Sequence, residues 1–302
     1  MTDFSREILE KWQVRKNQQQ KSNFIARMQQ QYPQMQVETE GRCRNLVLGD
    51  VESAEVVYTA HYDTCARMPF PNLIFPKSIL LSMLYGVVLG ILLAAIGDLA
   101  GCLASLLSGS LRSVGMIVAP ITYSVAVIGF LLMLFIGPAN PHTVNDNTSG
   151  VITLVELYES MSDAQRSKAA LVFFDMEELG LIGSARFKKR HSTVMEGKLL
   201  LNFDCVSDGD TIAVICGKRM AKNAIERLKD AFCGEGNKRV IVAREKEMYY
   251  PSDQKHFSQG VGVAALKGKK LLYLDRIHTR RDTVMDEENI RLIVSSAGKL
   301  AE

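Results

Sequence analysis

The sequence predicts a layered α/β domain with a mostly parallel central sheet, interrupted by a two-helix transmembrane hairpin. Short apolar runs of strand length alternate with longer amphipathic segments, a pattern typical of strands that are connected by helices. Two uncharged runs in the middle of the chain each have the length of a membrane span. The 302 residues are sufficient for one large buried core.

The amino-terminal part begins with a predicted amphipathic helix over residues 2–31, in which Phe4, Ile8 and Trp12 recur at roughly helical spacing. Two short strands are expected next, followed by a buried one with the sequence EVVYTA. These three strands cover residues 37–40, 44–48 and 55–60.

Beyond the apolar middle of the chain, strands and helices alternate up to a closing helix. We expect helices at residues 150–159, 183–191, 221–232 and 287–301, and strands at residues 170–175, 198–203, 211–216, 240–243 and 261–266.

Formal charge is distributed very unevenly along the chain. The whole sequence carries 36 Lys and Arg and 33 Asp and Glu, a net charge of +3. This balance excludes a strongly basic nucleic-acid-binding protein and an acidic disordered tail. Between residues 68 and 145, however, the only formal charges are Lys77, Asp98 and Arg112. The averages therefore describe neither part of the chain.

Residues 78–97 and 114–137 are the two uncharged runs. At 1.5 Å per residue the shorter run would extend about 30 Å, the thickness of a bilayer core. Neither run has the polar stripe of a helix on a soluble domain. We therefore predict a transmembrane hairpin within residues 68–138. The alternative is an apolar cap or dimerisation arm on a soluble protein, whereas a signal peptide is a poor explanation because the amino terminus is polar and charged.

Histidines and acidic residues follow the predicted strands, where α/β folds place their functional sites. His61 and Asp63 follow the strand at residues 55–60, and their spacing points both side chains to one side. A carboxylate commonly orients a metal-binding imidazole, although a surface histidine also explains this pair. Asp146 lies in NDNTSGV at the start of a helix, where a capping turn is the alternative.

Two adjacent glutamates, Glu177 and Glu178, end the strand in FFDMEELG. Their apolar neighbours make a solvated face a poor explanation, and one of the pair could bind metal while the other stays free as a base. Asp204 ends the strand in LNFD, and His278 lies in YLDRIHT near the end of the chain.

In this order, the blocks HYDT, NDNTSGV, FFDMEELGLIGS, LNFD, SDQKHF and IHTRRDT resemble the M28 family of metallopeptidases, which includes the co-catalytic zinc aminopeptidases. The resemblance covers residue 56 to the carboxyl terminus, apart from the apolar hairpin. It implies a three-layer αβα fold with a mixed, mostly parallel sheet. The catalytic domain would then consist of residues 1–67 and 139–302, with the hairpin of residues 68–138 inserted into it.

The resemblance also implies two zinc ions, for which manganese or cobalt could substitute. One ion would be bound by His61, Asp146 and Asp204. The other would be bound by Asp146, Glu178 and His278, so that Asp146 bridges the pair. Three carboxylates and two histidines form a mixed ligand set that suits zinc.

Glu177 would act as the general base, and Asp63 would be the carboxylate behind His61. The resemblance further implies a cis peptide bond between Asp146 and Asn147. Tyr249 lies where family members place a tyrosine beside the substrate, and Tyr250 competes for that role.

The resulting hypothesis is a membrane-anchored di-zinc aminopeptidase. A carboxypeptidase or amidohydrolase that uses the same metal site stays open, because one fold can host several specificities. From a different class, the chain could be a membrane scaffold or transport subunit with a vestigial hydrolase domain. The complete set of ligands and Glu177 argues against that reading.

The predicted hairpin lies between Asp63 and Asp146, whose family counterparts occupy one metal site. Both residues must then lie on the same side of the membrane, which requires an even number of spans. Both ends of the hairpin would also emerge near the site. We therefore expect the partners to be the lipid bilayer and a peptide that is hydrophobic, membrane-associated or delivered laterally, with no nucleic acid. The oligomeric state stays open.

Localisation is expected at the cell membrane, with two spans and the catalytic domain in the cytoplasm. Arg67 and Lys77 precede the first span, whereas the connector holds only Asp98 and Arg112. The six cysteines form no CxxC pair and no secretory signal is visible, which favours free thiols in a reducing compartment.

Overall fold

Eight strands form one mixed sheet in the order β1-β2-β4-β3-β5-β8-β6-β7 in this computed structural model, which describes residues 1–234 and 236–302. The pairs β3–β4, β3–β5, β5–β8 and β6–β7 are parallel, and the other three pairs are antiparallel. The predicted mixed, mostly parallel sheet is confirmed. The strands are β1 (Gln36–Glu40), β2 (Cys43–Leu48), β3 (Val56–His61), β4 (Ala169–Phe174), β5 (Leu199–Phe203), β6 (Thr211–Cys216), β7 (Arg239–Arg244) and β8 (Gly260–Leu266).

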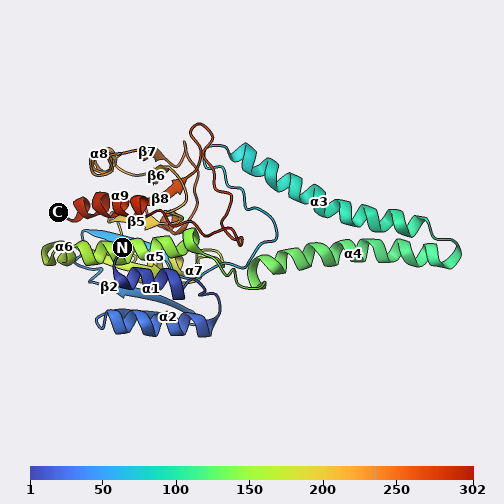
Figure 1. Ribbon diagram of the computed structural model, residues 1–302, viewed down its shortest axis with the longest axis horizontal. Coiled ribbons are helices and arrows are strands. Elements are labelled where there is room, and N and C mark those ends of the chain that lie inside the picture. The colour runs from blue at the N-terminus through green and yellow to red at the C-terminus, as the bar shows by residue number, and fades with distance from the viewer. Residues whose placement is uncertain (235) are drawn as a thin grey trace.

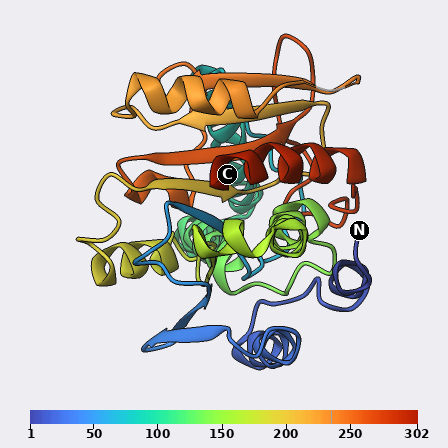
Figure 2. The same ribbon diagram turned by 90° about the vertical axis from the view of Figure 1, so that its left-hand side faces the viewer.

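Helices cover both faces of the sheet, as the predicted three-layer arrangement requires (Figures 1 and 2). Successive residues of a strand face opposite sides. Val56 and Tyr58 of β3 accordingly belong to the apolar cluster that includes residues of α1, α2, α5, α8 and α9, whereas Val57 belongs to the cluster on the other face, which includes Phe187 of α7. The helices are α1 (Asp3–Lys11), α2 (Gln18–Gln31), α5 (Ser149–Ser160), α6 (Asp163–Ser167), α7 (Ile182–Arg190), α8 (Lys222–Ala231) and α9 (Glu287–Gly298).

The single amino-terminal helix predicted over residues 2–31 is wrong, because the chain leaves the helix between α1 and α2. Asn17 starts α2 with a reciprocal cap: its side chain accepts from the Gln20 N–H at 2.9 Å, and the Gln20 side chain accepts from the Asn17 N–H at 2.9 Å. Arg15 turns inward in this connection and is fully buried. Its Nε donates to the Tyr62 carbonyl at 2.6 Å. Residues 15–23, between Val14 and Phe24, are all polar, so the apolar spacing is interrupted at the break.

Strands β3, β4 and β5 run in parallel, so their carboxyl ends meet at one edge of the sheet. His61 pairs with Phe174 in the register, and Thr59 pairs with Asn202. The segments that follow these strands therefore emerge side by side. A kinked turn, Val144–Thr148, in which Asp146 and Asn147 have non-helical dihedrals, leads into α5 at the same edge.

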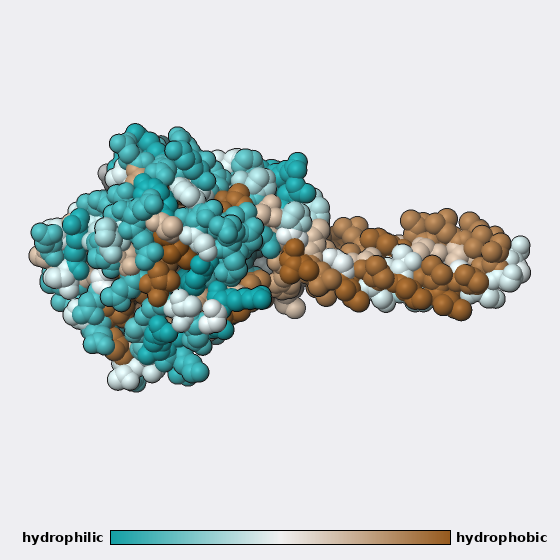
Figure 3. Space-filling model, turned by 90° about the horizontal axis from the view of Figure 1, so that it is seen from below, coloured by the Kyte–Doolittle hydropathy of each residue, from teal (hydrophilic) through white to brown (hydrophobic). Residues whose placement is uncertain are grey.

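A long hairpin of α3 (Ile79–Ser105) and α4 (Gly109–Ile136) projects from the α/β domain (Figure 1). Both helices are long and apolar enough to cross a membrane, with mean hydropathies of 2.6 and 2.3 in their most apolar windows. Of the residues in the most apolar stretch of each helix, 0% and 6% are buried. The two helices therefore do not serve as core helices of this domain (Figure 3). They also extend beyond the uncharged runs and include Asp98 and Arg112.

The two helices of the hairpin pack closely at small residues. A side chain on Gly115 would come within 2.6 Å of the Ala104 Cβ, and one on Gly97 within 2.9 Å of Tyr123. Such close contact is common between helices in lipid. At the base, Ala66 and Ala139 pair in an antiparallel bridge where the chain leaves and re-enters the domain. The division into residues 1–67 with 139–302 and residues 68–138 stays a prediction.

An ion pair between α1 and α2 gives the fold a pH-dependent contribution to stability. Glu7 accepts from the Arg27 guanidinium at 2.9 and 2.7 Å, which lowers the pKa of Glu7 from 4.5 to about 2. We expect Glu7→Gln to lower the free energy of unfolding at pH 7 by about 0.5–1 kcal/mol. Because a depressed carboxyl pKa contributes its full stability only above the unfolded value, the difference should shrink as the pH falls from about 4.5 towards 2 and vanish below the folded pKa. Thermal unfolding across this range measures it, with the exposed Glu10→Gln as control. A difference as large at pH 2 as at pH 7 would contradict the expectation.

Candidate metal centre

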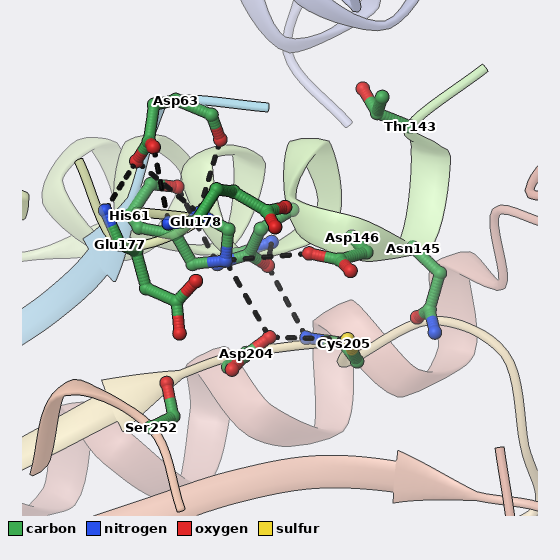
Figure 4. A network of polar contacts seen from close by, with 12 residues as sticks. His61, Asp63, Thr143, Asn145, Asp146, Glu177, Glu178, Asp204, Cys205 and Ser252 are labelled. Carbon is green, nitrogen blue, oxygen red and sulfur yellow. Dashed lines mark hydrogen bonds and ion pairs between the residues drawn. The ribbon is translucent and has the colours of Figure 1, made fainter. Parts of the chain in front are cut away.

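The predicted site residues converge at the carboxyl edge of the parallel strands (Figure 4). His61 ends β3, Asp204 follows β5, and the pair Glu177 and Glu178 follows β4. Asp146 lies in the turn before α5. His278 reaches the same place from the loop before α9, with a left-handed backbone φ of 61°.

The first group consists of His61, Asp146 and Asp204. The His61 Nε2 lies 3.4 Å from the Asp146 Oδ1 and 3.7 Å from the Asp204 Oδ1. All three side chains are buried, and their ligand atoms lie within 4.8 Å of one another. Atoms at this spacing can share one ion at the roughly 2 Å bond lengths typical of zinc.

The second group consists of His278 and Glu178, with Asp146 between the two groups. The His278 Nε2 lies 3.0 Å from the Asp146 Oδ2 and 3.4 Å from the Glu178 Oε2. Asp146 thus presents one carboxylate oxygen to each histidine, the arrangement that a bridging ligand needs. The structure brings all five predicted ligands together, and their roles as ligands stay a prediction.

Cys65 is a residue that the sequence did not reveal. Its Sγ forms a compact group with ligand atoms of Glu178 and His278, again within 4.8 Å of one another, and the residue is buried. The sequence signal for this position is weak: Cys65 follows His61 by four residues in HYDTC, but no second cysteine lies near it.

Asp63 connects two elements of the site. The His61 Nδ1 makes its hydrogen bond with the Asp63 backbone carbonyl at 3.1 Å, whereas the Asp63 Oδ1 lies 3.7 Å from that nitrogen, so the role of the carboxylate behind the imidazole stays a prediction. The same carboxylate also accepts the backbone N–H groups of Glu177 at 3.0 Å and Glu178 at 3.2 Å. One side chain therefore fixes the loop that carries both glutamates relative to His61.

Asp282 performs a similar positioning function for Asp146 and was not predicted. It accepts the backbone N–H of Asn145 at 2.7 Å and that of Asp146 at 3.0 Å. Its only sequence signal was its place in the block IHTRRDT. The peptide bond between Asp146 and Asn147 is cis, as predicted. The Asn147 side chain also donates to the Phe203 carbonyl at 2.9 Å, which ties this turn to the end of β5.

The site concentrates negative charge away from water. Burial raises the pKa of Glu177 well above its ordinary value, and the neighbouring carboxylates Glu178 and Asp253 raise it further. Burial likewise raises the pKa of Glu178 to about 8 and that of Asp253 to about 7. Desolvation and the repulsion between like charges both favour the protonated carboxyl. Bound cations would relieve this excess.

The residues present fit zinc. The donors are imidazole nitrogens and carboxylate oxygens, the set from which zinc sites are commonly built. In addition, the buried Glu178 Oε1 has no hydrogen-bond partner among the residues that the structure describes. A buried acceptor without a partner carries a desolvation cost that a metal bond would remove.

Tyr249 and Tyr250 both line the cavity that contains the metal cluster. Tyr249 is 43% exposed, whereas Tyr250 is buried and its hydroxyl lies 3.5 Å from the Asp204 carbonyl oxygen. The geometry thus places both tyrosines beside the cluster, and a role in substrate binding stays a prediction for each.

A family comparison accounts for the cluster. Residues 122–297, more than half of the chain, match the model for peptidase family M28. The chain belongs to peptidase family M28. It is accordingly a metallopeptidase. The match begins within α4, so the block that contains His61 and Asp63 lies outside the matched residues.

Solved structures share the fold at low sequence identity. Glutaminyl cyclase from Porphyromonas gingivalis is 12% identical, with a TM-score of 0.58 over 99% of this chain and 96% of that chain. The Legionella protein LapA is 14% identical, with a TM-score of 0.50 over 99% and 70%. A zinc aminopeptidase from Bacillus subtilis is 14% identical, with a TM-score of 0.47 over 85% and 49%, so this chain spans about half of its length. No curated protein matches the sequence.

Substitution of Asp282 should weaken metal binding without removing a ligand. In Asp282→Asn, the amide can accept only through its oxygen, so one of the two N–H groups of Asn145 and Asp146 loses its partner. We expect zinc affinity to fall about 10–100-fold. Chelator competition measures this, with the exposed Asp210→Asn as control. Equal affinities for the two variants would show that Asp282 does not position Asp146.

Proposed function

We propose that the protein is a membrane-anchored di-zinc aminopeptidase. The observation that carries the proposal is the position of Asp146, whose two oxygens face His61 on one side and His278 on the other. Each histidine has a further carboxylate beside it, Asp204 or Glu178. A pair of ions that shares one carboxylate fits this arrangement.

Zinc bound at these residues would lower the pKa of a coordinated water and polarise the carbonyl of the peptide bond. Glu177 lines the same cavity, and Asp63 fixes its backbone. In this position the Glu177 carboxylate takes the proton of the attacking water and passes it to the leaving amine. The peptide's amino-terminal residue is thereby released.

The formal charge of the cavity does not separate the aminopeptidase from the carboxypeptidase alternative. Four carboxylates line it, namely Asp146, Glu177, Glu178 and Asp204, whereas Lys255 is the one lysine or arginine among the described lining residues. Two zinc ions would balance the charge of these four carboxylates, so the loaded site attracts neither end of a peptide by its net charge. The choice between the two alternatives therefore depends on the peptide assays below.

Cyclisation of an amino-terminal glutamine is a second candidate function. It is supported by the structural similarity to a glutaminyl cyclase over nearly the whole of both chains. The two candidates differ in their products. An aminopeptidase releases a free amino acid, whereas a cyclase releases ammonia and leaves the peptide at full length.

The hairpin of α3 and α4 supports the membrane anchor. Its apolar side chains are exposed along both helices, which water would disfavour and a bilayer would cover. The proposed orientation places the α/β domain in the cytoplasm, on the charge pattern around the spans. All six cysteines are free thiols, in agreement with that compartment.

Glu177→Gln tests the chemistry. The amide cannot take up the proton, so we expect hydrolysis to fall about 10²–10⁴-fold while zinc stays bound. The reaction is identified by mass spectrometry of three peptides: one with a free amino terminus, one with an acetylated amino terminus and one that begins with glutamine. The exposed Glu196→Gln serves as the control variant. Cleavage of acetylated peptides from their carboxyl end, or ammonia release from glutaminyl peptides, would replace the proposed activity. Full activity of Glu177→Gln would exclude the proposed base.

Replacement of residues 67–138 by a short turn tests the anchor. Such a turn is feasible because Ala66 and Ala139 already pair across the base of the hairpin. We expect the full-length chain to remain in membranes after an alkaline carbonate wash, and the shortened chain to be soluble and still to bind zinc, because every proposed ligand is retained. Release of the full-length chain by carbonate would contradict the anchor.

A further inference from the structure

One cavity joins the metal cluster to the base of the hairpin. It has a volume of about 680 Å³, within the size range of small-molecule and peptide sites. One side is lined by the carboxylates and histidines of the metal centre. The other side is lined by Ile79 and Met83 in the first turns of α3 and by Phe135 in the last turn of α4.

The hairpin side of this cavity is apolar. Leu73, Ile74 and Phe75, which precede α3, continue the surface formed by Ile79 and Met83. Ile79 is 55% exposed and Met83 is 64% exposed, so this wall is not covered by the rest of the chain. Burial of apolar surface is favourable by about 25 cal/mol per Å², so a substrate with apolar side chains gains affinity here.

The apolar wall is fastened to the metal site. The Met68 N–H donates to the His278 carbonyl at 2.7 Å, and the Tyr249 N–H donates to the Pro76 carbonyl at 2.7 Å. Ile74 pairs with Leu274 in an antiparallel bridge. These contacts attach the segment before α3 to the loops that carry His278 and Tyr249. The position of the hairpin and the geometry of the cavity are therefore coupled.

The two helix ends that line the cavity lie at the same end of the hairpin, next to the α/β domain (Figure 1). Ile79 is the first residue of α3, and Phe135 is the last but one of α4. When the hairpin crosses a bilayer, these residues lie at the boundary between lipid and water. The cavity is then reached from the membrane surface.

We propose that the enzyme takes its peptide substrates from the membrane surface, and that apolar side chains near the substrate's amino terminus bind against Ile79, Met83 and Phe135. This inference rests on the proposed function and names its substrate class, amphipathic or apolar peptides adsorbed to lipid. The peptide's amino group points towards the carboxylates and its apolar side chains towards the hairpin.

Two peptides of equal length and net charge test the substrate class. They share an amino-terminal alanine, and one has an apolar face of leucines that the other replaces by glutamines. With the full-length protein in phosphatidylcholine nanodiscs, we expect kcat/KM for the leucine peptide to be about tenfold higher or more, with the difference in KM. Equal kcat/KM values for the two peptides would overturn the proposal.

Matched double variants distinguish the effect of the residues that line the cavity from the effect of the hairpin as a whole. Ile79→Gln with Met83→Gln should abolish the preference for the leucine peptide. Met116→Gln with Ile121→Gln makes the same chemical change on exposed hairpin residues outside the cavity and should retain the preference. Equal loss in both double variants would assign the effect to the membrane anchor and overturn the role of the wall.

A binding measurement keeps this inference distinct from the proposed activity. A leucine peptide with a photoactivatable leucine analogue is crosslinked to Glu177→Gln in nanodiscs, and the adducts are mapped by mass spectrometry. Adducts within residues 73–83 without hydrolysis by the unsubstituted protein would support the binding site and refute the aminopeptidase. Hydrolysis of both peptides at equal rates, without adducts in residues 73–83, would refute the binding site and leave the aminopeptidase standing.

Discussion

The concentration of buried carboxylates at one edge of the sheet is the constraint on which the rest of the structure depends. Asp63, Asp146 and Asp204 lie within a few ångströms of His61, and Glu177 and Glu178 follow β4 beside them. Like charges out of water repel one another strongly, and each also loses hydration. Such a cluster stays ionised only with cations. The metals for which the donors are suited would supply that positive charge, and the two imidazoles would bind them in the neutral form.

The backbone around the cluster is held by side chains that bind no ion in the proposed scheme. Asp63 and Asp282 each accept two backbone N–H groups from the segments that carry the ligands. Arg15 adds a buried guanidinium, which donates to the Tyr62 carbonyl and to the Thr148 hydroxyl on either side of the site. Because each contact joins segments far apart in the sequence, the ligand geometry depends on the whole domain having folded.

The sequence predicted the elements whose signals are local. Strands β3, β4 and β5 were found because apolar runs of strand length end in polar motifs, and their parallel pairing explains why His61, Glu178 and Asp204 converge. The break between α1 and α2 was missed because the apolar residues before and after the polar run of residues 15–23 were assigned to one helix. Cys65 and Asp282 were missed for another reason: their importance lies in contacts with distant segments, which no spacing along the chain records. Strand order was equally inaccessible, because β8 pairs antiparallel with β6 and parallel with β5.

The insertion point of the hairpin is itself a functional constraint. The chain leaves the domain after Cys65 and Ala66 and returns before Asp146, so both ends of the hairpin border the metal cluster. An appended anchor would leave the orientation of the active site relative to the bilayer free. Here the hydrogen bond from Met68 to the His278 carbonyl ties that orientation to the position of one proposed ligand. A cavity with carboxylates on one side and an apolar helix wall on the other imposes a direction on any peptide that enters it. The proposed membrane anchor and the proposed substrate selection would thus be two consequences of the same insertion.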